Sequence, residues 1–191
     1  MADYTTLQAD IVNTLAYDDI DPPLCIRLAE SSLNRKFRVQ AQETFSQATP
    51  ANQQPDGLWY LTYPADYLEM RLVKRGDDRV EYVTPSQMTT DLSQYDFYTL
   101  ANNLILLPSA DPVTLYYFGL IPALSDSNAT NWMTLNAYDA LLYMSLAHAC
   151  YQMDEQAKGD QYQQMGLSYA TAAQDADDRA RYSGSPLVQR G

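Results

Sequence analysis

The period of the apolar residues changes twice along this chain, and that change limits the folds it can adopt. Residues 5–40 repeat their apolar side chains every three or four positions, which is the spacing of two amphipathic helices. Residues 41–121 instead alternate short apolar runs with turn residues, as strands do. Helical spacing returns at about residue 134 and continues to residue 182. We therefore expect two helices, a β-rich middle and two more helices, in that order.

This order predicts an α+β fold, mainly a helical bundle of four main helices with a small β-rich lobe inserted at about residues 41–121. The segment Ala140–Tyr151 is apolar nearly all round, as expected of a buried central helix. We expect a single domain over residues 1–182. Residues 183–191 should form an extended C-terminal tail, because Ser183-Gly184-Ser185-Pro186 breaks the last helix.

Several local signals refine these elements. Thr5 and Gln8 have the spacing of a capping box for the first helix. Asp21 should cap the second helix, since a proline follows it at the first helical position. Asp66 and Glu69 also have cap spacing and predict a single helical turn. Two hairpins and two further strands are predicted, over residues 70–83, 97–107, 58–63 and 113–120.

The last helix is expected to begin at Asp154. Gly159 and Gly166 lie within it, and each costs the helix about 1 kcal/mol relative to alanine. Small residues there would let a neighbouring helix approach closely. The packing face should consist of four residues spaced three or four apart: Tyr162, Met165, Tyr169 and Ala173.

The composition is strongly acidic, with 24 acidic and 12 basic residues and a net charge of −12. Such a surface repels phosphate, which argues against sequence-specific binding of DNA or RNA. No apolar stretch is long enough to span a membrane, and the start Met1-Ala2-Asp3-Tyr4 lacks signal-peptide features. We therefore expect a cytoplasmic protein, unless a larger assembly carries it out. Sixteen tyrosines favour packing within the fold, with a subset in protein–protein contacts.

No catalytic, metal or cofactor site is predicted. The single histidine, His148, lies in the most apolar helix, and no Gly-x-Ser-x-Gly motif surrounds a serine. The carboxylate pairs Asp66 with Glu69 and Asp139 with Glu155 could serve a glycosidase, but such pairs arise by chance in an acidic chain. We interpret both cysteines as small buried apolar groups rather than as a disulfide: Cys25 and Cys150.

Charges of opposite sign gather on two of the predicted helices. The second helix is locally basic and the last helix ends in acidic residues: Arg27, Arg35 and Arg38, against Asp175, Asp177 and Asp178. This pattern favours a head-to-tail contact between copies of the chain, which closes into a ring when the rotation fits. Contact of the basic residues with nucleic acid, or with acidic surface of the same subunit, is the alternative.

Segments along nearly the whole chain resemble, in the same order, the head-to-tail adaptor proteins of tailed bacteriophages, especially short-tailed ones. No single motif is chemically diagnostic, so the weight lies in the order of the segments. The segments are Tyr4–Ile11, Ile26–Arg35, Tyr63–Leu72, Glu81–Pro85, Tyr116–Trp132 and Asp178–Leu187.

The resemblance implies a structural virion protein without catalysis. Such adaptors form a ring of about twelve copies under the portal, extend the DNA channel and receive the tail tube or nozzle protein. Double-stranded DNA would pass through an acidic channel without specific binding. The protein would be made in the host bacterial cytoplasm and lie in the virion neck. The alternatives are another neck or tail-completion component and a peptidoglycan hydrolase.

In related adaptors the C-terminal segment often reaches up to the portal. By position, this portal-binding segment would lie in the tail of the present chain, which should order on binding. Its residues are Ser183, Gly184, Ser185, Pro186, Leu187 and Val188.

Overall fold

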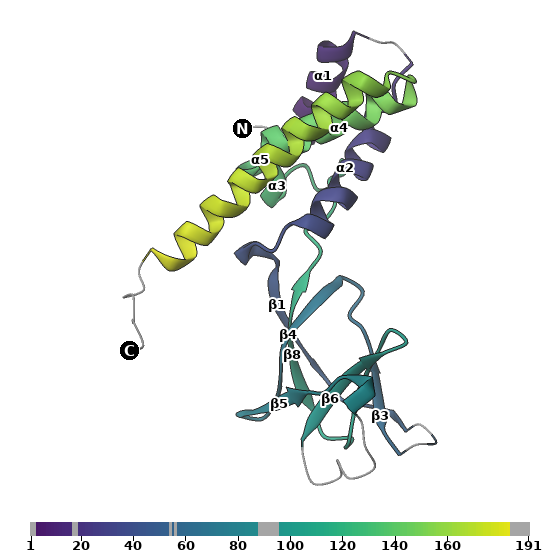
Figure 1. Ribbon diagram of the computed structural model, residues 1–191, viewed down its shortest axis with the longest axis vertical. Coiled ribbons are helices and arrows are strands. Elements are labelled where there is room, and N and C mark those ends of the chain that lie inside the picture. Colours follow the sequence, from purple (N-terminus) through teal and green to yellow (C-terminus); the bar gives the residue numbers. More distant parts are fainter. Residues whose placement is uncertain (1–2, 17–18, 54, 56, 88–95, 184–191) are drawn as a thin grey trace. The chain divides into compact units, whose positions relative to one another are not determined.

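The computed structural model describes residues 3–16, 19–53, 55, 57–87 and 96–183 (Figure 1). The chain divides into two compact units, each with its own hydrophobic core. The helical unit comprises residues 1–41 and 121–191, and the β unit comprises residues 42–120.

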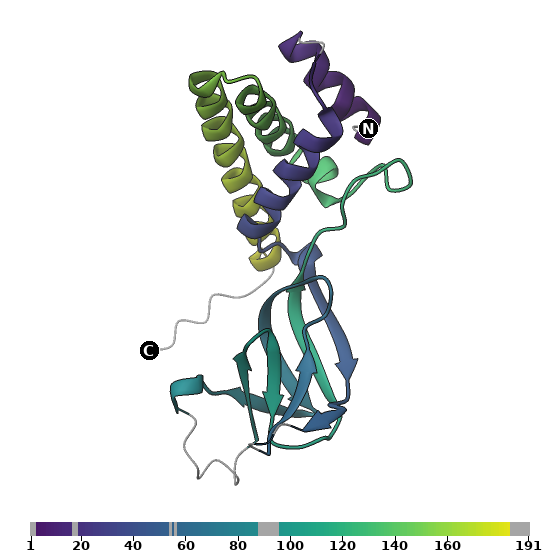
Figure 2. The same ribbon diagram turned by 90° about the vertical axis from the view of Figure 1, so that its right-hand side faces the viewer.

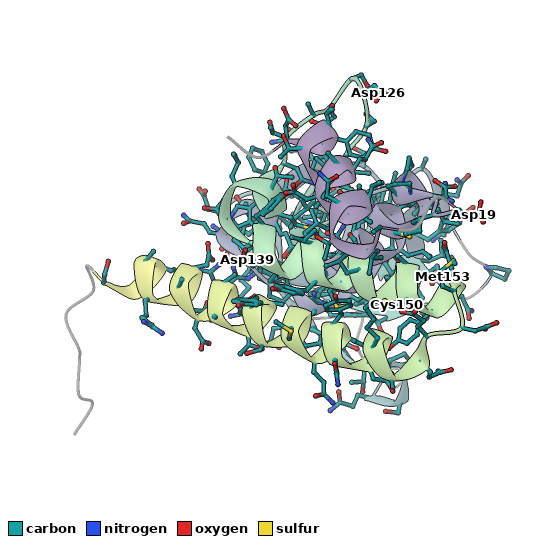
Figure 3. All side chains as sticks on the ribbon, turned by 90° about the horizontal axis from the view of Figure 1, so that it is seen from above. Asp19, Asp126, Asp139, Cys150 and Met153 are labelled. Carbon is teal, nitrogen blue, oxygen red and sulfur yellow. The ribbon has the colours of Figure 1, made fainter. Side chains whose placement is uncertain are left out.

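Among the described residues, five α-helices build the helical unit: α1 (Tyr4–Leu15), α2 (Pro22–Lys36), α3 (Trp132–Asn136), α4 (Tyr138–Gln152) and α5 (Gln156–Tyr182). α4 is central and packs against each of the other four. Figure 3 shows α5 running alongside α4, with Asp139 near the start of α4 and Met153 just beyond its end. Leu141, Met144 and Cys150 of α4 are buried. The predicted buried central helix is therefore confirmed.

Aspartates cap the first two helices. Asp21 caps α2, and its carboxylate accepts a backbone N–H of the first turn at 3.2 Å, as predicted. The predicted capping box of Thr5 and Gln8 is wrong, because α1 begins one residue earlier. Its cap is Asp3, whose carboxylate accepts the Thr6 N–H at 2.8 Å.

α5 approaches α4 closely at two glycines, and this part of the prediction is confirmed. A Cβ on Gly166 would lie 2.8 Å from Cγ of Met144 and 3.0 Å from its backbone N. A Cβ on Gly159 would lie 2.5 Å from the ring of Tyr151. Neither position can hold a larger residue unless Met144 or Tyr151 of α4 moves.

The buried face of α5 differs from the predicted one. Met165 and Tyr169 are exposed, although the ring of Tyr169 stacks on Tyr143 with centroids 5.5 Å apart. Because the helices approach so closely at the glycines, their contact follows the small residues rather than the large ones. The buried and half-buried positions that form this face are Gly159, Tyr162, Gly166, Ala170 and Ala173.

Eight strands of the described residues form the β unit: β1 (Glu43–Ala48), β2 (Asn52–Gln53), β3 (Trp59–Thr62), β4 (Tyr67–Arg75), β5 (Asp78–Tyr82), β6 (Phe97–Ala101), β7 (Leu104–Leu107) and β8 (Val113–Gly119). They form one curled sheet in the order β1-β8-β4-β5-β6-β7-β3-β2 (Figure 2). Neighbouring strands are antiparallel except β5 and β6, which are parallel. Val73, Ile105 and Leu115 lie at the centre of its core.

Both predicted hairpins are confirmed. β4 and β5 pair around a turn in which Gly76 has φ +58°, a left-handed conformation that glycine adopts without strain. β6 and β7 pair around Asn102 and Asn103, with φ of 53° and 61°. Asparagine tolerates this conformation better than most residues, and it is the one that a tight hairpin turn requires.

The predicted helical turn at Asp66 and Glu69 is wrong. Asp66 lies in a turn, and β4 begins at the next residue. The Asp66 carboxylate accepts the hydroxyl of Tyr117 on β8 at 2.9 Å, and its carbonyl accepts the Leu120 N–H at 2.7 Å. Asp66 therefore joins the start of β4 to the end of β8 instead of capping a helix.

The predicted fold class is also wrong, since the β part is not a small lobe on a helical bundle. It is an eight-stranded curled sheet with a core of its own. β1 escapes sequence prediction because its half-buried residues, Thr44, Ser46 and Ala48, are small or polar. All six of its residues nevertheless pair with β8. Backbone pairing thus completes the sheet where the apolar pattern is weak.

Candidate interaction surfaces

The six charged residues predicted at subunit contacts lie in the helical unit, in two different settings. Arg27 and Arg35 are exposed on α2, and Asp175 is exposed on α5. The other three are half-buried: Arg38, Asp177 and Asp178.

The C-terminal part of α5 contacts the segment that follows α2. The side chain of Gln174 accepts the N–H of Arg38 at 2.9 Å and donates to the Arg38 carbonyl at 3.1 Å. Asp177 accepts the N–H of Gln40 at 2.8 Å, and Asp178 accepts from the Gln174 amide at 3.4 Å. The acidic end of α5 therefore meets the basic end of α2 within one chain, and Asp177 binds backbone there.

The predicted portal-binding segment begins where α5 ends. Ser183 is the last described residue, and its hydroxyl donates to the Ala180 carbonyl at 3.0 Å. Gly184, Ser185, Pro186, Leu187 and Val188 lie outside the described residues. Portal binding by this segment stays a prediction.

Two polar residues of α2 hold the chain that leads into α3. The carboxylate of Glu30, only 4% exposed, accepts the N–H of Leu124 at 3.0 Å and the side-chain amide of Asn131 at 2.9 Å. One turn later, Asn34 accepts the N–H of Ile121 at 2.8 Å. These contacts fix residues 121–131 against α2.

Sequence reasoning missed this polar cluster, although a signal was present. Glu30 and Asn34 are four residues apart on the buried side of α2, where a polar group needs a partner. Burial raises the pKa of Glu30, and its hydrogen bonds to Leu124 and Asn131 oppose that rise. Since the chain itself supplies these donors, the cluster positions a loop rather than a ligand.

His148 and the two cysteines lie in apolar surroundings. Burial lowers the pKa of His148, and its ring meets Tyr151 edge-on at 6.4 Å. Within the described structure its Nε2 is buried without a hydrogen-bond partner. Cys25 and Cys150 are buried free thiols, as predicted. The described residues contain no group of three His, Cys, Asp or Glu that could hold a metal ion.

The two predicted carboxylate pairs do not form a site. Asp66 is bound to Tyr117, and Glu69 is exposed on β4. Asp139 lies in the first turn of α4 whereas Glu155 follows its end, so the helix, about 22 Å long, separates them. No helix in the described part of the chain is long and apolar enough to cross a membrane.

One face of the β unit carries an exposed aromatic surface. Phe45 of β1 is 65% exposed and lies opposite Tyr116 of β8, with ring centroids 6.0 Å apart. Tyr116 in turn lies opposite Leu72 of β4. These residues line a groove of about 510 Å³. We call it the aromatic groove, lined by Glu43, Phe45, Arg71, Leu72, Arg79 and Tyr116.

Cations lie along one side of the aromatic groove, on β4 and β5. Three of the four basic residues of the β unit lie at it, whereas Arg75 pairs with Asp96. Arg71 pairs with Glu43 and stands over the Phe118 ring, 5.0 Å from its centroid. The Lys74 ammonium stands 5.9 Å from the centroid of Tyr116. In a chain of net charge −12, this surface suits an acidic partner that also presents an apolar side chain.

Comparison with known proteins identifies a family. A family model described as SU10 adaptor protein matches residues 2–190. A search of curated proteins found no match. The family match spans both units, and it includes the aromatic groove and the polar cluster around Glu30.

Proposed function

Because the chain belongs to the SU10 adaptor protein family, we propose that it is a structural virion protein that joins the portal of the capsid to the tail. In this role it forms a ring and extends the channel through which double-stranded DNA leaves the head. The match over residues 2–190 carries the proposal. It takes in the helical unit and the β unit together, so the family description applies to the whole chain.

The charge of the chain supports a channel role. With a net charge of −12, a ring of subunits repels the DNA phosphates, so passing DNA is not gripped. The DNA is therefore cargo, and its sequence is not read. A ring that held DNA tightly would slow its ejection.

The neck of a virion supplies two protein partners, one at each end of the ring. The portal binds the C-terminal segment Ser183–Val188, and the tail tube or nozzle protein binds the opposite end. The protein is made in the host bacterial cytoplasm and is then built into the virion.

Neighbouring subunits meet head to tail, with the acidic end of α5 on one side. The exposed carboxylate of Asp175 supports this role, and the exposed guanidinium groups of Arg27 and Arg35 are candidates for the basic side. Arg38, Asp177 and Asp178 lie next to this surface, where they also contact their own chain.

No catalytic step belongs to this function. The carboxylate of Asp66 binds Tyr117, and that of Glu30 binds Leu124 and Asn131. We therefore expect no clearing when the purified protein is run in a gel that contains bacterial cell wall. Clearing that survives further purification would contradict this part of the proposal.

Electron microscopy of the purified protein, alone and mixed with the portal, tests the function. We expect rings that stack coaxially on the portal. Removal of residues 183–191 should abolish portal binding without preventing ring formation. Unchanged portal binding by the truncated chain would show that the tail assignment is wrong, and failure of the full chain to bind the portal would overturn the function itself.

A further inference from the structure

The aromatic groove exposes side chains that folded proteins usually cover. Phe45 has 65% of its surface in contact with water, and it lies beside Tyr116 on the same face of the sheet. Contiguous exposed apolar surface with a charged rim marks a binding site. The groove of about 510 Å³ gives an incoming side chain a place to insert.

The charges around the groove select the kind of partner. Lys74, Arg71 and Arg79 make its rim basic, but Glu43 also lies in the lining. A carboxylate inside the groove and the net charge of −12 both oppose a polyphosphate backbone. An acidic protein surface with separate carboxylates and an apolar centre fits this arrangement better.

Such a surface exists on the chain itself, along α5. Asp160, Leu167, Thr171 and Asp175 are all exposed and are spaced seven, four and four residues apart, so they lie on one stripe of the helix. Leu167 is 38% exposed and stands between acidic residues, and the basic residues at the groove lie beyond Tyr116 from Phe45, on β4 and β5. We call these four residues the acidic stripe. Leu167, Thr171 and Asp175 are exposed on the side away from Gly166, whereas Asp160 accepts the hydroxyl of Tyr151 of α4 at 2.8 Å.

We infer that the aromatic groove of one subunit binds the acidic stripe of α5 from a second copy of the chain. Leu167 then packs against Phe45 and Tyr116, while Asp175 faces the basic rim at Arg79. The inference rests on the proposed ring, and it names a basic surface other than α2 for the head-to-tail contact.

This contact uses two different surfaces of each subunit. Every copy carries one groove and one stripe, so each subunit binds a neighbour on either side, and the series closes when the rotation between subunits fits a ring. α5 has 27 residues and is about 40 Å long, so the stripe is accessible along several turns. Charge complementarity between the two surfaces also fixes the order of the subunits.

An exposed aromatic ring permits a first test with little risk to folding. Phe45→Ser should lower the affinity between subunits at least about tenfold, because it removes the apolar centre of the groove. The matched control is Tyr82→Ser, which removes an aromatic ring that is 50% exposed on β5 of the same unit but outside the groove. Sedimentation velocity over a concentration series measures assembly, and circular dichroism shows that both variants are folded.

A charge exchange tests the pairing itself. Arg79→Glu and Asp175→Lys should each weaken assembly when purified separately. When the two variants are mixed in equal amounts, assembly should be restored. The altered groove of Arg79→Glu then binds the altered stripe of Asp175→Lys, and the unaltered groove and stripe of the two variants also bind each other. Lys36→Glu, at an exposed position of α2, changes the net charge by the same amount as Arg79→Glu and should leave assembly unchanged.

The outcomes separate this inference from the proposed function. Rings that form normally with Phe45→Ser and Arg79→Glu, or that fail only with Lys36→Glu, would overturn the inference and leave the adaptor role standing. Variants that assemble normally but lose a tail protein would show that the groove binds that protein instead. A full chain that stays monomeric both alone and with the portal would overturn the ring and the inference together.

Discussion

In the helical unit, the polar side chains nearest the core bind the chain's own backbone, whereas the β unit displays most of its cations around an open aromatic face. Glu30 and Asn34 hold the residues that lead into α3, and Gln174 and Asp177 hold the residues after α2. In the β unit, Phe45 and its cationic neighbours line a groove.

This difference separates two tasks. A polar group that is buried and paired within the chain fixes local geometry, and its burial keeps it away from a partner. An exposed ring beside exposed charges adds little to folding but a large amount to association. We therefore expect mutations of buried residues in the helical unit to change stability, and mutations in the aromatic groove to change assembly.

The largest effect on stability is expected from the core of the helical unit. Phe37 is fully buried and meets Trp132 edge-on at 5.2 Å. Phe37→Ala should lower the free energy of unfolding by about 3–5 kcal/mol, through lost burial and the cavity left behind. Urea denaturation followed by circular dichroism measures the change. A loss below about 1 kcal/mol would contradict the view that the helical unit holds its shape by tight packing.

A smaller loss is expected at Glu30. Glu30→Leu leaves the N–H of Leu124 and the amide of Asn131 without their acceptor, and should cost about 1–3 kcal/mol. Glu30→Gln retains a carbonyl oxygen as acceptor and is the matched control. If both variants unfold at the same urea concentration as the wild type, the cluster does not stabilise the unit.

The same carboxylate predicts a pH dependence. Burial raises the folded pKa of Glu30 above its ordinary value of 4.5, so the unfolded chain releases this proton at a lower pH than the folded one. The contribution of Glu30 to stability is therefore fully present below pH 4.5 and is lost as the pH rises through the raised pKa. Unfolding curves across this range should show a decline in the wild type that is absent from Glu30→Gln.

Gly166→Ala should lower the free energy of unfolding by a net value of about 1 kcal/mol. Alanine favours a helix over glycine by about 1 kcal/mol, but its Cβ would lie 3.0 Å from the backbone N of Met144, and such overpacking costs about 1–3 kcal/mol. Ser168→Ala, at an exposed position of the same helix, controls for helix propensity. Stabilisation by Gly166→Ala would show that α4 and α5 can separate without cost.

The smallest effect on folding is expected in the aromatic groove. Phe45→Ser should change the free energy of unfolding by less than about 0.5 kcal/mol, because its ring is mostly exposed already. Urea denaturation at a concentration too low for assembly measures this value. A loss of several kcal/mol would contradict the contrast between the two units, since Phe45 would then belong to the core of the β unit.

The sequence predicts well where the apolar pattern and the packing agree. The central helix α4, the cap Asp21 and both hairpins follow from spacing and turn residues, and the two glycines of α5 correctly mark a close contact. Prediction from the sequence fails where contacts between distant residues determine the local structure. β1 lacks an apolar inward face, and Asp66 bonds to a residue 51 positions away.

The interaction surfaces were harder to predict than the fold. Charge alone pointed to α2 and to the end of α5, because basic and acidic residues cluster there in sequence. The aromatic groove is assembled from four strands, β1, β4, β5 and β8, and Phe45 lies in β1, whose other residues are mostly polar. Only the pairing register of β1, β8 and β4 brings Phe45, Tyr116 and Leu72 onto one face.

The pairing of β1 with β8 has a consequence for how this protein can evolve. Glu43, near the start of the β unit, lies opposite Phe118, near its end, so the chain enters and leaves the unit at neighbouring points. Insertions with adjoining ends can be lengthened, shortened or exchanged while the flanking segments remain in place. The β unit is thus an insertion with adjoining ends, so its length and loops can change without a shift of the helices that flank it.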